Sequence, residues 1–89
     1  VILSEPSEGS VFINGHSFAV TYLVGDSNPF TSTIFYTGPS NGSISGGSDI
    51  FVTANLTLSV PGNYEINIIA TDSAGYSGSD NVTISIVQS

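Results

Sequence analysis

Apolar and polar residues alternate along the stretch from 49 to 60. Every second position is apolar, while Thr, Asn and Ser fill most of the positions between. A period of two places successive side chains on opposite faces of an extended strand. The stretch therefore predicts a strand with one buried face, whose inward residues are Ile50, Val52, Ala54, Leu56, Leu58 and Val60.

Two further strands are predicted toward the C-terminus. Pro61-Gly62 breaks the first strand, and the second then places Tyr64, Ile66, Ile68 and Ala70 on its inward face. A Gly/Ser loop over 73–79 precedes a third strand, whose inward residues are Val82, Ile84 and Ile86. Because short connections join antiparallel strands, we expect all three to be antiparallel.

The N-terminal half predicts shorter strands. Residues 1–3 are apolar and end at Glu5-Pro6, and the apolar residues 11–13 run into Asn14-Gly15. Asn-Gly is the strongest short signal for a β-hairpin turn. Apolar residues then recur at every second position from Phe18 to Val24. The pattern predicts two short strands and a longer third, with a hairpin turn at Asn14-Gly15.

The middle of the chain completes the pattern. A turn over 26–29 leads into a strand over 32–36, and the Gly/Ser/Asn-rich residues 38–48 predict a loop with a weak strand at Ile44. No segment carries a helical period. About seven short strands with frequent turn signals are typical of an immunoglobulin-like β-sandwich. Since 89 residues leave no room for a second core, residues 1–89 are expected to form one domain.

Two segments resemble a known family. VPGNYEINIIATDSAGYSGSDNVTISIV, residues 60–87, resembles the last two strands of the immunoglobulin-like modules of bacterial and archaeal surface proteins, and LSEPSEGSVFING, residues 3–15, resembles their opening strand. Polycystic-kidney-disease-type repeats share the C-terminal half, but their Trp-Asp-x-Gly-Asp-Gly segment is absent. The resemblance implies an all-β immunoglobulin-like sandwich of about seven antiparallel strands in two sheets. It also implies that Tyr64 is a tyrosine corner, whose hydroxyl binds the backbone of the preceding turn.

The charge of the chain limits its partners and its setting. There are seven acidic residues and neither Lys nor Arg, which gives a net charge of −7. Nucleic-acid binding depends on cations that neutralise phosphate, so the composition argues against it, and anionic membrane surfaces are disfavoured as well. Neutral hydroxyl and amide side chains suit an acidic, hot or protease-rich medium. We therefore expect an extracellular or cell-surface protein of a prokaryote, such as an archaeon.

Membrane insertion by the chain itself is not expected. No apolar run reaches the roughly 18 residues of a membrane span. Any signal peptide or anchor is accordingly expected outside these 89 residues.

Few residues could carry catalysis. Lys and Cys are absent, and the single histidine, His16, follows the Asn14-Gly15 turn, where an exposed residue is expected. Residues 38–42 match the G-x-S-x-G pattern, with Ser40 in the nucleophile position. That motif needs a strand-to-helix turn on a parallel sheet, which this pattern of strands does not offer. We predict no catalytic residue and no enzyme activity.

Three aspartates could meet at one end of the sandwich. In the immunoglobulin topology the loops that hold Asp26, Asp72 and Asp80 emerge at the same end as the N-terminus, and carboxylate oxygens suit Ca²⁺. The Ala-x-Asp that ends at Asp72 also resembles a motif of cadherin-type calcium junctions, although their other ligand motifs are missing. The alternative is that Asp72 and Asp80 accept backbone hydrogen bonds in a turn, as Asp commonly does. Calcium is the only cofactor that the sequence suggests.

Three Asn-x-Ser/Thr sequences are candidate glycosylation sites. Asn55 and Asn81 lie on the outward faces of their predicted strands, and Asn41 lies in the longest loop. Exposed acceptors of this kind can carry glycan in an archaeal or eukaryotic host.

Several large apolar residues are expected on the surface. The alternation places Phe30, Phe35, Phe51 and Tyr76 outward or in loops, but there is no Trp and no evident coplanar platform for a sugar. Phe51, Ile69 and Val87 instead indicate that a sheet face or edge meets a neighbour.

These features predict a non-catalytic structural or adhesive module of the cell exterior. It would be a subunit or repeat of a surface filament, pilus, surface layer or stalk. Its partners would be like subunits or neighbouring immunoglobulin-like domains, bound through apolar sheet faces and strand edges, including an exchanged edge strand. The alternative is a carbohydrate-binding accessory module of a secreted glycoside hydrolase, with glycan as its partner.

Overall fold

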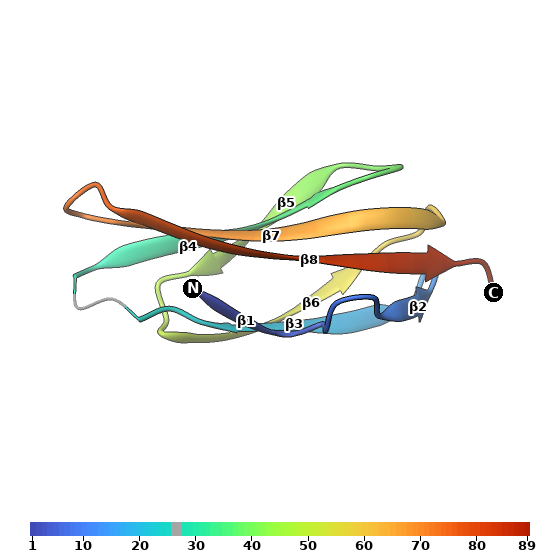
Figure 1. Ribbon diagram of the computed structural model, residues 1–89, viewed down its shortest axis with the longest axis horizontal. Coiled ribbons are helices and arrows are strands. Elements are labelled where there is room, and N and C mark those ends of the chain that lie inside the picture. The colour runs from blue at the N-terminus through green and yellow to red at the C-terminus, as the bar shows by residue number, and fades with distance from the viewer. Residues whose placement is uncertain (26–27) are drawn as a thin grey trace.

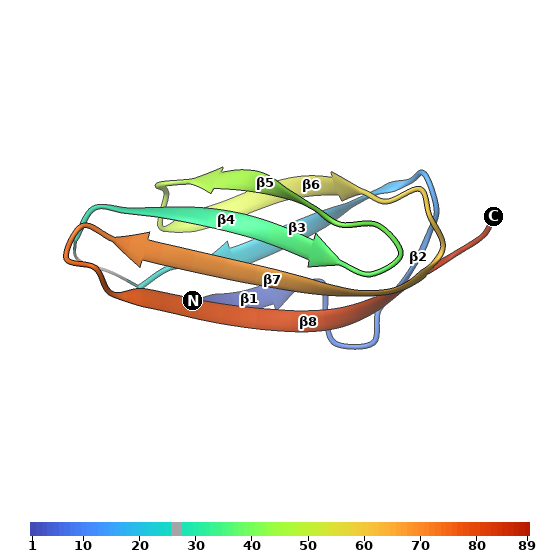
Figure 2. The same ribbon diagram turned by 90° about the horizontal axis from the view of Figure 1, so that it is seen from above.

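The chain folds into two β-sheets packed face to face (Figure 1). The computed structural model describes residues 1–25 and 28–89. The strands in these ranges are β1 (Ile2–Glu5), β2 (Val11–Ile13), β3 (Ser17–Leu23), β4 (Phe30–Thr37), β5 (Gly42–Gly47), β6 (Phe51–Thr57), β7 (Gly62–Asp72) and β8 (Ser77–Val87). One sheet has the order β1-β3-β6 and the other β2-β8-β7-β4-β5. Figure 2 shows β5, β4, β7 and β8 side by side, with the smaller sheet behind them. The predicted immunoglobulin-like β-sandwich is confirmed.

The long strand β7 is the centre of the larger sheet. It pairs antiparallel with β8 over Gly62↔Ile86 to Thr71↔Ser77, and antiparallel with β4 on its other side. The sequence predicted β6 and β7 as successive antiparallel strands, but they lie in different sheets. Pro61-Gly62 therefore carries the chain from one sheet to the other instead of closing a hairpin.

The expected hairpin at Asn14-Gly15 is wrong. β2 pairs with β8, and this pair is parallel, while β3 belongs to the other sheet. The turn crosses between the sheets because its backbone is bound on both sides: the Asn14 NH donates to the Val87 carbonyl at 2.9 Å, and the Gly15 NH donates to the Leu58 carbonyl at 3.0 Å. The strands of the described ranges are thus eight rather than about seven, and not all of their pairings are antiparallel.

Residues 42–47 form a full strand, where the sequence predicted a loop with a weak strand. β5 pairs antiparallel with β4, with Ile44 opposite Ile34. Two of its glycines make room for tyrosine hydroxyls. A Cβ at Gly46 would overlap the hydroxyl of Tyr22, and a Cβ at Gly42 would overlap that of Tyr36. The glycines that made the segment resemble a loop therefore allow it to lie against the aromatic residues.

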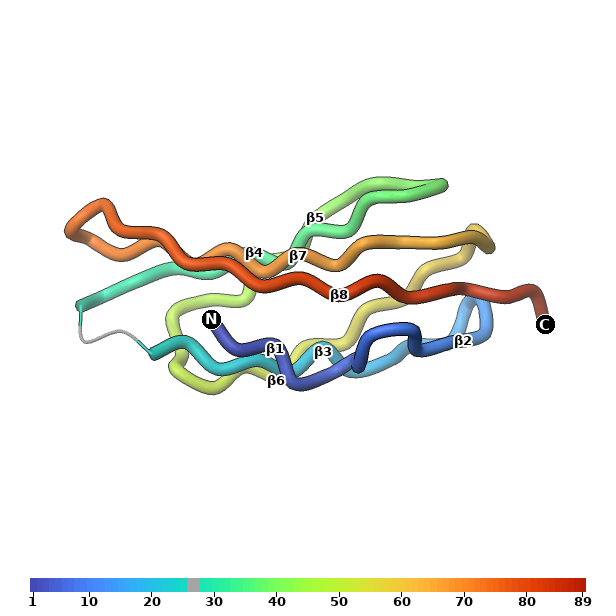
Figure 3. The backbone as a smooth tube through the Cα atoms, in the orientation of Figure 1, coloured from blue at the N-terminus to red at the C-terminus, as the bar shows by residue number. Residues whose placement is uncertain are grey.

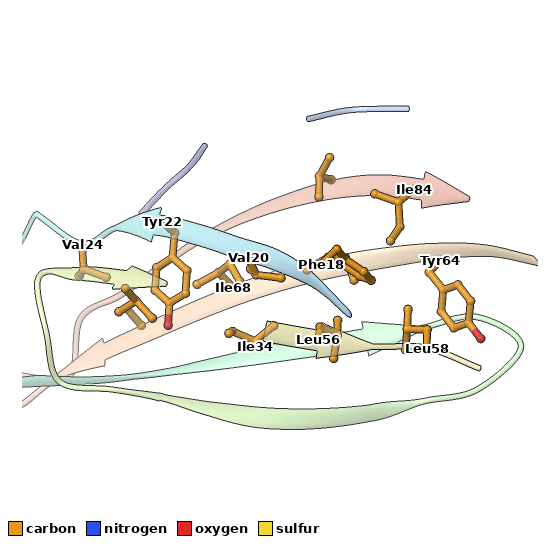
Figure 4. Close-up of a cluster of buried hydrophobic side chains, with 14 of the residues drawn as sticks. Phe18, Val20, Tyr22, Val24, Ile34, Leu56, Leu58, Tyr64, Ile68 and Ile84 are labelled. Carbon is orange, nitrogen blue, oxygen red and sulfur yellow. The ribbon is translucent and has the colours of Figure 1, made fainter. Parts of the chain in front are cut away.

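The core lies between the sheets and follows the predicted alternation in β3, β7 and β8. Figure 4 shows side chains from both sheets meeting there, including Phe18, Val20, Leu56 and Ile68. Two expectations about burial fail. Phe30, expected on the surface, is the first residue of β4 and is buried. Ile50 and Val60, expected inside, lie beyond the ends of β6 and are exposed.

The sandwich is elongated, with extents of 43 × 19 × 17 Å. Figure 3 shows the β7–β8 turn at one end of the long axis and the C-terminus at the other, with the N-terminus between them. The accessible surface is 4884 Å², close to the roughly 4,900 Å² expected for a compact monomer of this mass. Exposed apolar side chains on this molecule are therefore not the sign of an open core.

Candidate functional site

Tyr64 holds the connection between β6 and β7. Its hydroxyl donates to the Val60 carbonyl at 2.6 Å, which is the bond that a tyrosine corner makes. The Ser40 Oγ lies 3.0 Å from the same hydroxyl. Since the tyrosine proton is directed at Val60, Ser40 acts as the donor in this second bond. Ser40 stands between the strands β4 and β5 and not before a helix, so the nucleophile-elbow geometry is absent at this position.

The carboxylate of Asp72 organises the β7–β8 turn. The side chain is only 8% exposed. Its Oδ1 accepts the backbone NH groups of Ala74 at 3.0 Å and Tyr76 at 2.9 Å, and the Asn28 amide lies 3.5 Å from Oδ2. The Asp72 NH also donates to the Tyr76 carbonyl. Asp72 thus accepts backbone hydrogen bonds in a turn, which is the alternative to calcium binding that the sequence left open for it.

Asp80 lies farther along β8 and binds a different element. Its Oδ2 accepts the Leu3 NH at 2.9 Å, which ties β1 of one sheet to β8 of the other, and its Oδ1 accepts the Asn81 NH. Asp80 is opposite Ile68, four residues from Asp72 along β7. At about 3.3 Å per residue, this places the two aspartates roughly 13 Å apart along the strand.

The structure does not bring a calcium site together in the ranges it describes. No three His, Cys, Asp or Glu side chains of residues 1–25 and 28–89 form a group that could hold a metal ion. Asp26, the third predicted ligand, lies outside the described residues. The calcium site stays a prediction.

The three candidate glycosylation sites are all accessible. Asn41 lies in the β4–β5 turn, where its Oδ1 accepts the Gly38 NH at 3.0 Å. Asn55 projects from β6 and Asn81 from β8, and both are exposed. Glycosylation of these residues stays a prediction.

Little else in the described part of the chain offers chemistry. His16 is exposed, as expected. A shallow hollow of ≈ 330 Å³ is lined by Pro29, Phe30, Thr31, Thr71, Asp72 and Ser73. Its one carboxylate is the turn-forming Asp72, so the hollow lacks a second group that could act with it.

A row of apolar side chains crosses the outer face of the three-stranded sheet. Ile2 on β1 is opposite Leu23 on β3, which is opposite Phe51 on β6. The three side chains are 64%, 39% and 62% exposed. We call these residues the apolar row. The sequence pattern identified Phe51 as outward, but Ile2 and Leu23 join it only through the strand register.

Other exposed apolar residues are spread over the larger sheet. Ile69 on β7 and Val87 on β8 are exposed, as the alternation predicted for them and for Phe51, and Val87 lies beside the exposed Ile13 of β2. Among the described residues, no helix is long and apolar enough to cross a membrane.

Two sheets with this strand order define the class of immunoglobulin-like and fibronectin type III-like sandwiches. The chain is similar to the fibronectin(III)-like modules of Clostridium thermocellum CbhA, with a TM-score of 0.76 and 22% identity over 98% of this chain and 93% of that one. It is also similar to part of a candidate glycoside hydrolase from Bacteroides vulgatus, with a TM-score of 0.63 and 12% identity, covering 90% of this chain and 16% of that one. At these identities the likeness shows the fold. No protein-family model and no curated protein matches the sequence.

Proposed function

We propose that the chain is a non-catalytic structural module of the cell exterior, a subunit or repeat of a surface filament, pilus, surface layer or stalk. The observation that carries the proposal is the apolar row, because a closed and compact sandwich keeps three large apolar side chains next to one another on its outer face. A contiguous exposed apolar patch of a few hundred Å² on a folded domain is often a functional surface.

Two further features support a structural role. The polar side chains that are buried serve the fold: Tyr22 and Ser32 bind each other at 2.6 Å, and Asp72 binds its own turn. In addition, the chain is similar in fold, over almost its whole length, to fibronectin(III)-like modules. A module whose buried polar groups bind one another, and which keeps several apolar side chains on its surface, is suited to packing against neighbours.

Electron microscopy of native material tests the proposal. Filaments, lattices or regularly spaced stalks that antibodies against this chain decorate are the expected result. Decoration of dispersed single particles that carry hydrolase activity would overturn it.

A second candidate is a carbohydrate-binding accessory module, which the environment of Tyr76 favours. Tyr76 is 75% exposed at the β7–β8 turn and borders a hollow of ≈ 190 Å³ between the ends of the sheets. An exposed aromatic ring beside a hollow can stack on a sugar. Retardation of the chain in affinity gels that contain polysaccharide, abolished by Tyr76→Ser, would establish this function and reject the structural one.

A further inference from the structure

Within the described residues, the two sheets end in four edge strands: β1 and β6 in the smaller sheet, β2 and β5 in the larger. An edge strand carries backbone NH and carbonyl groups that no neighbouring strand pairs, and folded proteins commonly keep such edges short, bulged or charged. Three of the four edges fit this description. β2 has three residues, β1 has four with a register shift and ends at Glu5, and the register of β5 against β4 shifts between Ser32 and Thr33.

The fourth edge strand, β6, is long, regular and uncharged. Its seven residues pair with β3 in one unbroken register, from Leu23↔Phe51 to Ser17↔Thr57. The strand contains neither a charged residue nor proline. On its other side, no strand of the described ranges pairs with it. An edge of this form is a template for a further strand.

The core is also incompletely covered along this edge. β5 and β6 contact each other on one flank of the sandwich, and Figure 2 shows them next to each other there. Ala54 of β6 and Ile44 of β5 pack against the core but are only half-buried, whereas their register partners on the neighbouring strands, Val20 and Ile34, are fully buried. We call Ala54, Ile44 and the free edge of β6 the open flank.

We propose that an extended segment of another protein pairs with β6 and covers the open flank. In strand addition of this kind, backbone hydrogen bonds give the affinity and alternate side chains give the specificity. Every second side chain of the added segment faces inward beside Ala54, where an apolar residue fits. The inference rests on the proposed function, and it names the edge at which the module binds a neighbour.

The charge of the chain determines the chemistry of that neighbour. The net charge is −7, and there is no Lys or Arg. Asp49, two residues before the start of β6, is exposed. A strand from a second copy would bring the same negative charge to this edge, whereas a segment that carries Lys or Arg is attracted to it. The partner segment is therefore extended, apolar at every second position and cationic at the positions between.

An NMR titration of the isotope-labelled 89-residue chain tests the inference. The probe is a seven-residue peptide of alternating Val and Lys, blocked at both ends. We expect saturable shifts of the β6 amide signals with a Kd of about 1 mM or lower, and weaker binding in about 0.5 M NaCl, which screens the charges. The same peptide N-methylated at every residue keeps its charge and apolar side chains but cannot donate backbone hydrogen bonds. It should bind at least about tenfold more weakly.

Two matched variants locate the edge. Ala54→Lys places a charge on the inner side of β6, where an added strand would have to bury it, and should weaken binding roughly tenfold or more. Ala19→Lys makes the same change on the outer face of β3, opposite Asn55, and should lower the affinity by no more than about threefold. Thermal melts check that both variants are folded. If Ala54→Lys is not, the two peptides decide the question on the native chain.

The contrary outcomes are specific. Signal shifts confined to β2 or β5, or equal binding of the N-methylated peptide, would overturn the inference. Equal binding of a peptide of alternating Val and Glu would reject the cationic partner. Shifts of the β6 signals that appear in the chain alone as its concentration rises would make a second copy the occupant and would also overturn it. In each case the structural function stands, because a repeat can join its neighbours at its ends, and electron microscopy of native material tests that function separately.

Discussion

Tyr22 shows how a single residue connects the two sheets. Its ring is buried in the core, and its hydroxyl lies 2.6 Å from the Ser32 Oγ, which donates in turn to the Gly47 carbonyl at 3.2 Å. Tyr22 belongs to β3, whereas Ser32 and Gly47 belong to β4 and β5 of the other sheet. Inside a protein an unpaired hydroxyl is costly, so this chain of bonds lets polar atoms cross an otherwise apolar core.

Gly46→Ala should destabilise the fold by about 1–3 kcal/mol, because the added methyl overlaps the Tyr22 hydroxyl and comes within 2.5 Å of the Ser32 Oγ. Urea unfolding measures the loss. Gly25→Ala is the matched control, since a Cβ there meets nothing within 4 Å, and it should be close to neutral. Adding Tyr22→Phe should recover part of the loss in Gly46→Ala. Full additivity of the two changes would show that the hydroxyl is not the obstacle.

Tyr64→Phe should lower the free energy of unfolding by about 1–2 kcal/mol, because the Val60 carbonyl and the Ser40 hydroxyl both lose a partner. In a domain of this size the thermal midpoint should fall by roughly 4–8 °C per kcal/mol. Tyr76→Phe, at an exposed ring, serves as the control and should leave the midpoint unchanged. Equal midpoints for Tyr64→Phe and the native chain would contradict the tyrosine corner.

Asp72→Ala should cost about 1.5–3 kcal/mol, because two backbone NH groups of the β7–β8 turn lose a charged acceptor. Asp72→Asn keeps an oxygen acceptor and should cost less. Thermal melts with Ca²⁺ and with chelator separate this role from metal binding. A calcium site would raise the midpoint of the native chain in Ca²⁺ but not that of Asp72→Asn, whereas an unchanged midpoint of the native chain rejects the calcium prediction.

At the scale of elements, the sequence predicts strands better than it predicts their partners. Alternation is a local property, and it located β6, β7 and β8 to within a few residues. Pairing is not local. β2 was assigned to a hairpin because Asn14-Gly15 is a strong turn signal, but the turn is held by Val87 and Leu58, which are distant in the sequence. β5 was missed because its glycines serve contacts with Tyr22 and Tyr36 that no local pattern reveals.

The same limit applies to the candidate site. Phe51 could be assigned to the outer face from its own strand. Its neighbours in the apolar row come from two other strands, and the register that aligns Ile2, Leu23 and Phe51 depends on the whole sheet. A row of this kind can be identified only once the pairing is known.

Hydrogen exchange should reveal a gradient of stability across the larger sheet. β7 is paired on both sides, by β8 and β4, so its amides should exchange only through global unfolding. β2 and β5 are the two edges of that sheet and should exchange through local opening. The protection of β4 and β8 should lie between these limits. Protection of β5 equal to that of β7 would contradict the arrangement.

At the scale of the whole molecule, charge and apolar surface act in opposite directions. The chain carries a net charge of −7 at pH 7, and no Lys or Arg offsets it. Like copies therefore repel at neutral pH. The exposed apolar residues favour association, so the balance depends on the medium.

Association between copies should strengthen as the pH falls from 7 toward the isoelectric point of about 4.1, because protons taken up by the carboxylates reduce the net negative charge. Static light scattering measures this as a second virial coefficient that falls with pH. Added salt at pH 7 should act in the same direction, since it screens the same repulsion. A virial coefficient that is independent of both pH and salt would show that charge does not control association.

The parallel pairing of β2 with β8 determines how the sandwich responds to tension along its length. Both strands run in the same direction. A force that pulls the N-terminal end of β2 and the C-terminal end of β8 apart therefore slides one strand along the other. The bonds from Gly9 NH to the Thr83 carbonyl and from Asn14 NH to the Val87 carbonyl are then loaded in shear, together. Bonds that must break together resist a pull better than bonds that open one after another.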